Sequence, residues 1–330
     1  MKNYLNRLIQ HQQLSKSEAR QVLIQIAEGA FDSHQVASFM TIYMMRPIAL
    51  EELEGFQEAL LDLCTQVDLS EFDPIDLCGT GGDGKDTFNV STLASFVCAG
   101  AGVPVAKHGN YGVSSVCGSS NVLEHLGIRF TTDEELLKRC LEKANIAILH
   151  APLFHPAMKA VAPIRRALGV KTFFNMLGPL VNPSFPNKQL VGVFSLELAR
   201  IYGYLYQKTT KNYSVIYALD GYDEASLTGD LKWINTRGEH VLRPRDFGSE
   251  VLDPKQIEGG EDVASSAAIF SEVLQAKGSD PQHKVVIANA ALAIATAKDI
   301  PIAKAILEAE ASLFEHKALK CFNELKQLVN

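Results

Sequence analysis

The sequence predicts an α/β protein: a small all-helical N-terminal domain, then a larger α/β domain with a central, mainly parallel sheet flanked by helices. Its 330 residues, 47% of them hydrophobic, are enough to bury a core in each of two domains. Helical periodicity runs from residue 1 to about residue 70. After Pro74, short apolar runs alternate with helical windows, which is typical of a sheet covered by helices.

The N-terminal region carries the signals of several consecutive helices. Ser15 is followed by Glu18, a capping box that predicts the start of a helix. Apolar periodicity then predicts further helices over residues 34–45 and 50–64. We therefore expect a helical bundle at this end of the chain.

The domain boundary is predicted where the helical pattern gives way to the polar stretch 68–73 and then to Pro74. We expect the helical domain at residues 1–72 and the α/β domain at residues 73–330. A later helical segment near residues 165–188 is expected to pack on the small domain.

Strands and helices should alternate through the larger domain. The expected strands cover residues 75–77, 104–106, 146–149, 190–194 and 214–219. The expected helices cover residues 90–101, 133–144, 157–168 and 196–208, with a hairpin over 231–242 and at least two buried helices over 264–309.

The composition narrows the classes of function. A formal net charge of −7 favours neither nucleic acid nor an anionic membrane, so local groups must hold any anionic substrate. The six cysteines form no C-x-x-C pair, which favours reduced thiols. The N-terminus lacks an apolar signal core, and no stretch approaches the roughly 20 apolar residues of a membrane span. We expect a cytoplasmic protein with no membrane or nucleic-acid partner.

A glycine-rich loop leaves the first predicted strand and precedes a helix, so its backbone N–H groups can converge on an anion. It matches G-x-G-x-x-G through Gly79, Gly81 and Gly84, and part of a Walker A motif through Gly84 and Lys85. The Walker pattern fails at Asp86, where a serine or threonine is required.

The dinucleotide pattern fails as well, because residues 103–107, roughly 20 positions further on, contain no acidic side chain for a ribose. We therefore interpret the segment as a phosphate-binding loop that is neither a Walker A loop nor a dinucleotide-binding loop. A glycine-rich turn that binds no ligand is the alternative.

Three hydrogen-bonding residues, Asn89, Ser91 and Thr92, start the next helix, although capping needs only one. That excess indicates a phosphate or its metal at the helix N-terminus, with Ser91 as an oxygen ligand.

A second polar loop follows the next predicted strand, at the edge where α/β sheets bind their ligands. Lys107 is suited to phosphate as a point charge, and a solvated lysine is the alternative. His108 could be a structural loop histidine or a base. Ser119 offers a hydroxyl and an N–H group at the start of another helix.

Two further sets of charged residues are candidates for the site. Asp223 and Glu224 follow a predicted strand and could hold Mg²⁺ together with substrate phosphates, with a solvated acidic pair as the alternative. Arg165 and Arg166 end a helical window, where one arginine could grip a carboxylate or both could face solvent.

Taken in order along the chain, these motifs resemble those of the anthranilate phosphoribosyltransferase family. The matching positions are 79–83, 89–92, 107–110, Ser114–Ser115, 155–158, Arg165, 175–179 and 223–224. The resemblance covers essentially the whole chain and implies a homodimer that uses Mg²⁺, with two ions per subunit. It also implies the transfer of a phosphoribosyl group from phosphoribosyl pyrophosphate to anthranilate, a step of tryptophan biosynthesis.

The resemblance implies a role for individual residues. Those expected to bind phosphoribosyl pyrophosphate are Gly79, Gly82, Asp83, Thr87, Asn89, Val90, Ser91, Thr92, Lys107, Ser115 and Ser119. Those expected to contact anthranilate are Gly79, Asn110 and Arg165. Ser91, Asp223 and Glu224 are expected to hold the magnesium ions. The sequence departs from the family pattern at Tyr111, where an arginine is usual.

Catalysis in such a site is expected to be mostly electrostatic, with Lys107 and the metal stabilising the departing pyrophosphate. The amine of anthranilate is already neutral near pH 7, so no strong base is required, and His108 is the candidate if one acts. A nucleoside phosphorylase of the same fold is one alternative function. A non-catalytic relative that binds nucleic acid is the other, and the net charge of −7 opposes it.

Overall fold

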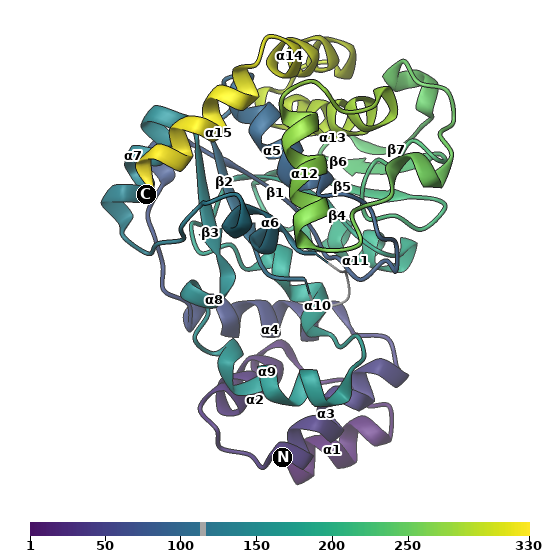
Figure 1. Cartoon of the computed structure of the whole chain (residues 1–330). Coiled ribbons are helices and arrows are strands. Elements are labelled where there is room, and N and C mark those ends of the chain that lie inside the picture. Colours follow the sequence, from purple (N-terminus) through teal and green to yellow (C-terminus); the bar gives the residue numbers. More distant parts are fainter. Residues whose placement is uncertain (113–116) are drawn as a thin grey trace. The chain divides into compact units, whose positions relative to one another are not determined.

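The computed structural model describes residues 1–112 and 117–330, and the chain divides into two compact units (Figure 1). The first unit consists of Met1–Gln66 and Ala151–Pro183, and the second of Val67–His150 and Ser184–Asn330. The first segment therefore ends before residue 72, and the later segment spans 151–183 rather than 165–188.

The contacts of the boundary residues explain where the units divide. Within the first unit, the backbone N–H of Thr65 donates to the carbonyl of Phe154 at 2.8 Å. Residues just after the boundary belong to the second unit, because Asp68 is bonded to Glu134 and Asp73 forms an ion pair with Lys188.

The first unit is helical, as its sequence pattern predicts. Its helices are α1 (Lys2–Ile9), α2 (Lys16–Ala27), α3 (Ser33–Met45), α4 (Leu50–Asp62), α8 (Ala151–Phe154), α9 (Met158–Leu168), α10 (Phe174–Leu177) and the 3₁₀ helix η2 (Gly178–Leu180). The capping box of Ser15 and Glu18 starts α2, as predicted. Phe39 of α3, Phe56 of α4 and Phe173 of the later segment form the aromatic core, with the rings of Phe56 and Phe173 stacked at 4.7 Å.

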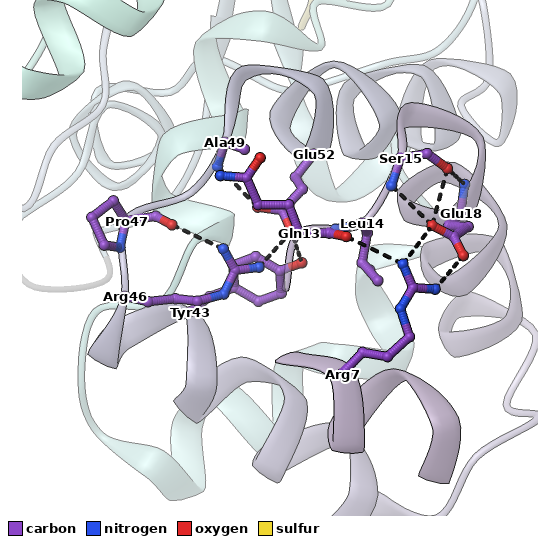
Figure 2. A network of polar contacts seen from close by, with 10 residues as sticks. All are labelled: Arg7, Gln13, Leu14, Ser15, Glu18, Tyr43, Arg46, Pro47, Ala49 and Glu52. Atoms are coloured by element: carbon purple, nitrogen blue, oxygen red, sulfur yellow. Dashed lines mark hydrogen bonds and ion pairs between the residues drawn. The ribbon is translucent and has the colours of Figure 1, made fainter. Parts of the chain in front are cut away.

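A fully buried carboxylate, that of Glu52 on α4, ties the loops of this unit together (Figure 2). It accepts hydrogen bonds from the backbone N–H groups of Leu14 and Ala49, both at 2.9 Å, and from the phenol of Tyr43 at 3.0 Å. The guanidinium of Arg46 completes the set as an ion pair and lies 4.5 Å from the centre of the Tyr43 ring. Leu14 belongs to the connection between α1 and α2, and the other three partners belong to the end of α3 and its connection to α4. One side chain therefore ties two helix connections together.

The second unit is built on a seven-stranded sheet of order β3-β2-β1-β4-β5-β6-β7 (Figure 1). The strands are β1 (Ile75–Gly79), β2 (Val105–Gly109), β3 (Ile146–His150), β4 (Lys188–Gly192), β5 (Asn212–Ala218), β6 (Leu231–Asn235) and β7 (Gly238–Leu242). Strands β1 to β5 are parallel, and β6 and β7 form the predicted hairpin as antiparallel neighbours. The predicted fold class is therefore confirmed.

Strand β4 differs from its prediction, because it covers Lys188–Gly192 rather than residues 190–194. Its register with β1 pairs Ile75 with Lys188 and Gly79 with Gly192, so the two strands end together. The apolar pattern continues beyond Gly192, which is why the sequence places the strand two residues late.

The helices of the second unit follow the predicted alternation, except that the helix predicted over residues 157–168 belongs to the first unit, as α9. They are α5 (Val90–Gly100), α6 (Ser119–His125), α7 (Glu134–Ala144), α11 (Leu196–Gln207), α12 (Val263–Leu274), α13 (Asp280–Lys298), α14 (Ile302–Phe314) and α15 (Lys317–Leu328), with 3₁₀ turns η1 (Ser70–Phe72), η3 (Pro244–Phe247) and η4 (Pro254–Ile257). Helices α5 and α13 pack against each other and against the central strands. Most of α13 is buried, which explains its alanine-rich sequence.

Within the described ranges, no single helix has both the length and the apolar composition to cross a membrane. Helices α13 and α14 meet these two criteria only as a pair, and the chain bends by 119° between them.

We predict that Glu52→Ala lowers the free energy of unfolding by about 3–5 kcal/mol, because it leaves the cation of Arg46 buried without its partner. Urea unfolding followed by far-ultraviolet circular dichroism measures the loss. Asp62→Ala is the matched control on the same helix, since the Asp62–Arg20 ion pair is exposed and should contribute less than about 1 kcal/mol. Similar losses in the two variants would contradict the assignment.

Candidate active site

The loop between β1 and α5 has a backbone path that only glycine adopts readily. Gly81, Gly82 and Gly84 have φ angles of +62°, +76° and +76°, in the left-handed region that side chains disfavour. The glycines that suggest a phosphate loop are therefore needed for the shape of the turn.

The loop after β5 closes tightly onto the ends of β1 and β4. A Cβ atom added to Gly79 would lie 2.4 Å from Oδ2 of Asp223, and one added to Gly192 would lie 1.5 Å from the carbonyl oxygen of Asp223. A side chain at position 192 would overlap the Asp223 backbone, and one at position 79 would displace the Asp223 carboxylate. Both strands must therefore end in glycine for Asp223 to reach the glycine-rich loop.

Hydrogen bonds hold the acidic pair against that loop and against the start of α5. The N–H of Gly81 donates to Oδ2 of Asp223 at 2.7 Å. Glu224 accepts from the hydroxyl of Thr87 at 3.1 Å and from the N–H of Ser91 at 3.3 Å. Thus the structure brings together candidate residues that are more than 130 positions apart.

The two carboxylates lie in an environment that opposes their ionisation. Burial, followed by the charge of nearby Asp83, raises the pKa of Asp223. Burial also raises the pKa of Glu224, to which the charges of Asp223 and Asp83 add. Among the described residues, neither Asp223 nor Glu224 forms an ion pair. A bound cation would relieve this repulsion, so the donor set fits a divalent metal.

The described part of the chain contains no group of three or more His, Cys, Asp or Glu side chains arranged for a metal. Magnesium does not need one, because one or two carboxylates plus substrate phosphates and water usually complete its shell. Asp223 and Glu224 line a small cavity together with Ser91, the third expected ligand. Asp83, expected to bind substrate, lies beside Asp223, and the backbone N–H of Asp223 donates to Oδ2 of Asp83 at 3.4 Å.

The N-terminus of α5 keeps polar groups that no cap uses, as its composition suggests. Asn89 is the N-cap residue but makes no capping bond, and its amide donates instead to the carbonyl of Cys117 at 3.2 Å. The hydroxyl of Thr92 is buried and has no hydrogen-bond partner among the residues described. Val90 is buried in the first turn of the helix. An unpaired hydroxyl beside a helix N-terminus is suited to phosphate.

Lys107 lies within β2 and is almost fully buried, not solvated as the alternative held. Its Nζ donates to the carbonyl oxygen of Leu77 at 2.5 Å, and burial lowers its pKa despite the nearby charge of Glu224. The next residue, His108, is also buried, and its backbone N–H donates to Asp76 at 3.0 Å. Both side chains are therefore buried within β2 and are not part of the exposed loop that follows it.

The loop after β2 is held by a residue that the sequence did not single out. Oδ1 of Asn121 accepts from the N–H groups of Gly112 and Gly118, at 3.0 and 3.1 Å, and so brings these two residues together. The hydroxyl of Ser119 donates to the carbonyl of Asn110 at 3.2 Å, which brings these two candidates together. Ser115 falls outside the described residues.

Tyr111 stands where the family pattern usually has an arginine, and its side chain contacts α6 and β3. Its phenol donates to Glu124 at 3.3 Å, and its ring meets the edge of His150 at 4.8 Å. His150 is in turn stacked on Phe130 and bonded to Ser120. The tyrosine therefore braces the loop against α6 and β3.

Arg165 lies on α9 in the first unit, where its surroundings are aromatic. Its guanidinium lies 5.5 Å from the centre of the Phe174 ring, and its Nη2 donates to Oδ1 of Asn175 at 3.4 Å. Burial lowers its pKa. Arg166 is exposed, so of the two arginines Arg165 is the one suited to a carboxylate ligand.

Comparisons with known proteins bear on the whole chain. Residues 2–64 match the glycosyl transferase family, helical bundle domain, and residues 71–319 match the glycosyl transferase family, a/b domain. An anthranilate phosphoribosyltransferase of Christiangramia forsetii is 59% identical over 328 residues, which cover 99% of each chain. The chain belongs to the anthranilate phosphoribosyltransferase family. The predicted resemblance is therefore confirmed, and the chain is an enzyme of the pentosyltransferase class.

Other members of the anthranilate phosphoribosyltransferase family agree with this assignment. The Flavobacterium psychrophilum enzyme is 58% identical over 99% of both chains. The solved structure from Thermus thermophilus has a TM-score of 0.91 at 28% identity, with 98% of each chain covered. The structure from Saccharomyces cerevisiae in complex with PRPP and Mg has the same TM-score and identity and covers 99% of this chain and 97% of its own.

We predict that Glu224→Gln stabilises this family member at pH 8 in the absence of Mg²⁺ and changes its stability less at pH 5. The folded-state pKa of Glu224 lies above the unfolded value. Wild-type stability is therefore complete below the unfolded pKa and falls as pH rises through the folded pKa.

Thermal unfolding in the presence of EDTA measures this difference. The melting temperature should shift by about 2–4 °C for each kcal/mol of stability in a chain of this size. Asp86→Asn removes an exposed carboxylate from the same region and should leave the midpoint unchanged. A Glu224→Gln variant less stable than the wild type at pH 8 would contradict the prediction.

Proposed function

We propose that this chain transfers the phosphoribosyl group of 5-phosphoribosyl 1-pyrophosphate to the amine of anthranilate, a step of L-tryptophan biosynthesis. The products are N-(5-phosphoribosyl)anthranilate and pyrophosphate. The observation that carries this proposal is the convergence of Asp223 and Glu224 on the glycine-rich loop and Ser91. Full-length similarity to anthranilate phosphoribosyltransferases supports the same reaction.

Magnesium, held by Asp223, Glu224 and Ser91, would stabilise the negative charge that builds on the departing pyrophosphate. Support comes from the buried, mutually repelling carboxylates of this chain and from the yeast relative solved with PRPP and Mg. We propose two ions per subunit, with substrate phosphates supplying the remaining ligands.

The phosphates of the donor substrate meet groups that favour negative charge. The loop from Gly79 to Asp83 and the start of α5 at Asn89 to Thr92 are proposed to face these phosphates, because the helix dipole favours anions there. The N–H groups of Gly81 and Ser91 already donate to Asp223 and Glu224, so they hold the acidic pair. Lys107 adds positive charge from beneath the strand ends, and Ser115 and Ser119 belong to the same proposed set. Hydrogen bonds already hold Lys107 and Ser119, so these two side chains need little reorganisation as the bond breaks.

The acceptor needs orientation more than activation. Arg165 is proposed to bind the carboxylate of anthranilate, with Asn110 and Gly79 as further contacts, because a guanidinium pairs with a carboxylate in a bidentate manner. The neutral amine then attacks the ribose carbon as pyrophosphate leaves. His108 is the proposed base if the proton must be removed within the site.

The proposal also covers the oligomeric state of the protein and its location in the cell. Large apolar side chains are exposed on the first unit, namely Ile9, Met44 and Met45, and they support a homodimer formed through the helical domain. All six cysteines are free thiols, which supports a cytoplasmic, reducing environment.

Mixing the protein with Mg²⁺, phosphoribosyl pyrophosphate and anthranilate should remove the fluorescence of anthranilate with time. The same mixture without Mg²⁺ is expected to react far more slowly, because the pyrophosphate would leave without its counter-charge. Persistence of the fluorescence at every Mg²⁺ concentration would refute the proposed reaction. Release of a free base from a nucleoside in the presence of phosphate would favour the phosphorylase alternative.

Arg165→Ala should raise the Michaelis constant for anthranilate by about 10- to 100-fold, the loss expected for a charge-assisted hydrogen bond. The Michaelis constant for phosphoribosyl pyrophosphate should change much less. Arg166→Ala is the matched control, since its exposed neighbouring side chain should affect neither constant. Equal effects of Arg165→Ala on both substrates would remove Arg165 from its assigned role.

A further inference from the structure

One amide side chain stands out in the core of the second unit. Every residue of α13 from Val285 to Ala295 is buried, and Asn289 is the one polar side chain in that run. It is only 3% exposed. A buried amide is costly unless its hydrogen bonds are satisfied, so its partners explain its presence.

The partners of Asn289 lie in the acidic loop, 64 residues away in sequence. Its Oδ1 accepts from the N–H of Ala225 at 3.0 Å, and its Nδ2 donates to the carbonyl of Ala225, also at 3.0 Å. The second hydrogen of Nδ2 is donated to the carbonyl of Val285 at 2.8 Å, within the same helix. The amide is therefore clamped in one orientation, because both of its N–H groups and its oxygen are used.

The clamped peptide directly follows the proposed metal ligands. Ala225 is the residue after Glu224, and Asn289 lines the same cavity as Asp223, Glu224 and Ser91. The backbone N–H of Asp223 has only a long contact, 3.4 Å to Asp83. The reciprocal bond pair to Ala225 therefore holds the backbone of the loop directly beside the carboxylates.

Such a tether has a physical purpose. Two adjacent buried carboxylates repel each other, so a loose loop would let them separate and would lose the geometry that a divalent cation needs. Groups that orient metal ligands from one shell further out commonly set the affinity for the metal.

We infer that Asn289 is a positioning residue that holds the backbone at Ala225 and keeps Asp223 and Glu224 converged for Mg²⁺ and the pyrophosphate of the substrate. The inference rests on the proposed function. It adds a residue from a distant helix that acts through the backbone of the acidic loop.

The test is isothermal titration of phosphoribosyl pyrophosphate into the full-length protein, with and without Mg²⁺ and without anthranilate, so that no turnover occurs. The factor by which Mg²⁺ tightens binding is the readout. Asn289→Leu, of similar size but without hydrogen bonds, should reduce that factor by about 10- to 100-fold.

Asn289→Ser is the second variant, in case the leucine variant does not fold. A serine hydroxyl can still bond the carbonyl four residues earlier in the helix, so α13 is kept while the pair to Ala225 is lost. Asn289→Ser should therefore show the same reduction. Thr296→Val is the matched control, because Thr296 bonds α13 to Ser214 of β5 at 2.6 Å and touches no residue of the acidic loop. It should lower the melting temperature and leave the Mg²⁺ factor unchanged.

Asn289 variants that lose stability as Thr296→Val does, yet keep the wild-type Mg²⁺ factor, would overturn the inference in favour of simple packing. Equal weakening of binding with and without Mg²⁺ would overturn it too. A wild-type protein whose binding does not respond to Mg²⁺ would refute the proposed metal site itself, and the inference with it. The wild-type titration thus separates the two failures.

Discussion

The site depends on one close approach, in which the carboxylate of Asp223 meets the end of β1 and the backbone carbonyl of Asp223 meets the end of β4. Only glycine at positions 79 and 192 leaves room for it, because a Cβ atom at either position would overlap Asp223. Since β1 and β4 end in register, the loop after β5 reaches both at once. The glycine-rich loop, the start of α5 and the acidic pair are therefore assembled by strand register and the absence of two side chains.

The protein buries carboxylates in two contrasting ways. Glu52 in the helical unit is paired with Arg46 and accepts three further hydrogen bonds, so its charge is compensated within the fold. Asp223 and Glu224 have hydrogen bonds but no ion pair in the part of the chain that the structure describes. A compensated charge supports structure, whereas an uncompensated buried pair marks a place where a cation belongs.

The same contrast explains how stability and function are distributed. In the α/β unit, the left-handed turn of Gly81, Gly82 and Gly84 and the repelling acids lie together beside the carboxyl end of β1. The apolar helices α5 and α13 pack behind that edge and stabilise it. Tertiary packing thereby offsets the local cost of an arrangement that suits the phosphorylated substrate better than it suits the empty protein.

The sequence by itself determined the fold class, the strand–helix alternation and the motif set, because hydrophobic periodicity, caps and glycine loops are local signals. It also supplied Asp223 and Glu224 as candidates. Only the tertiary structure decided that they meet Gly81, Thr87 and Ser91. The clamp of Asn289 on Ala225 and the need for Gly192 were likewise invisible, because each depends on contacts between distant segments. Strand register and core packing create those contacts, and a local sequence pattern predicts neither of them.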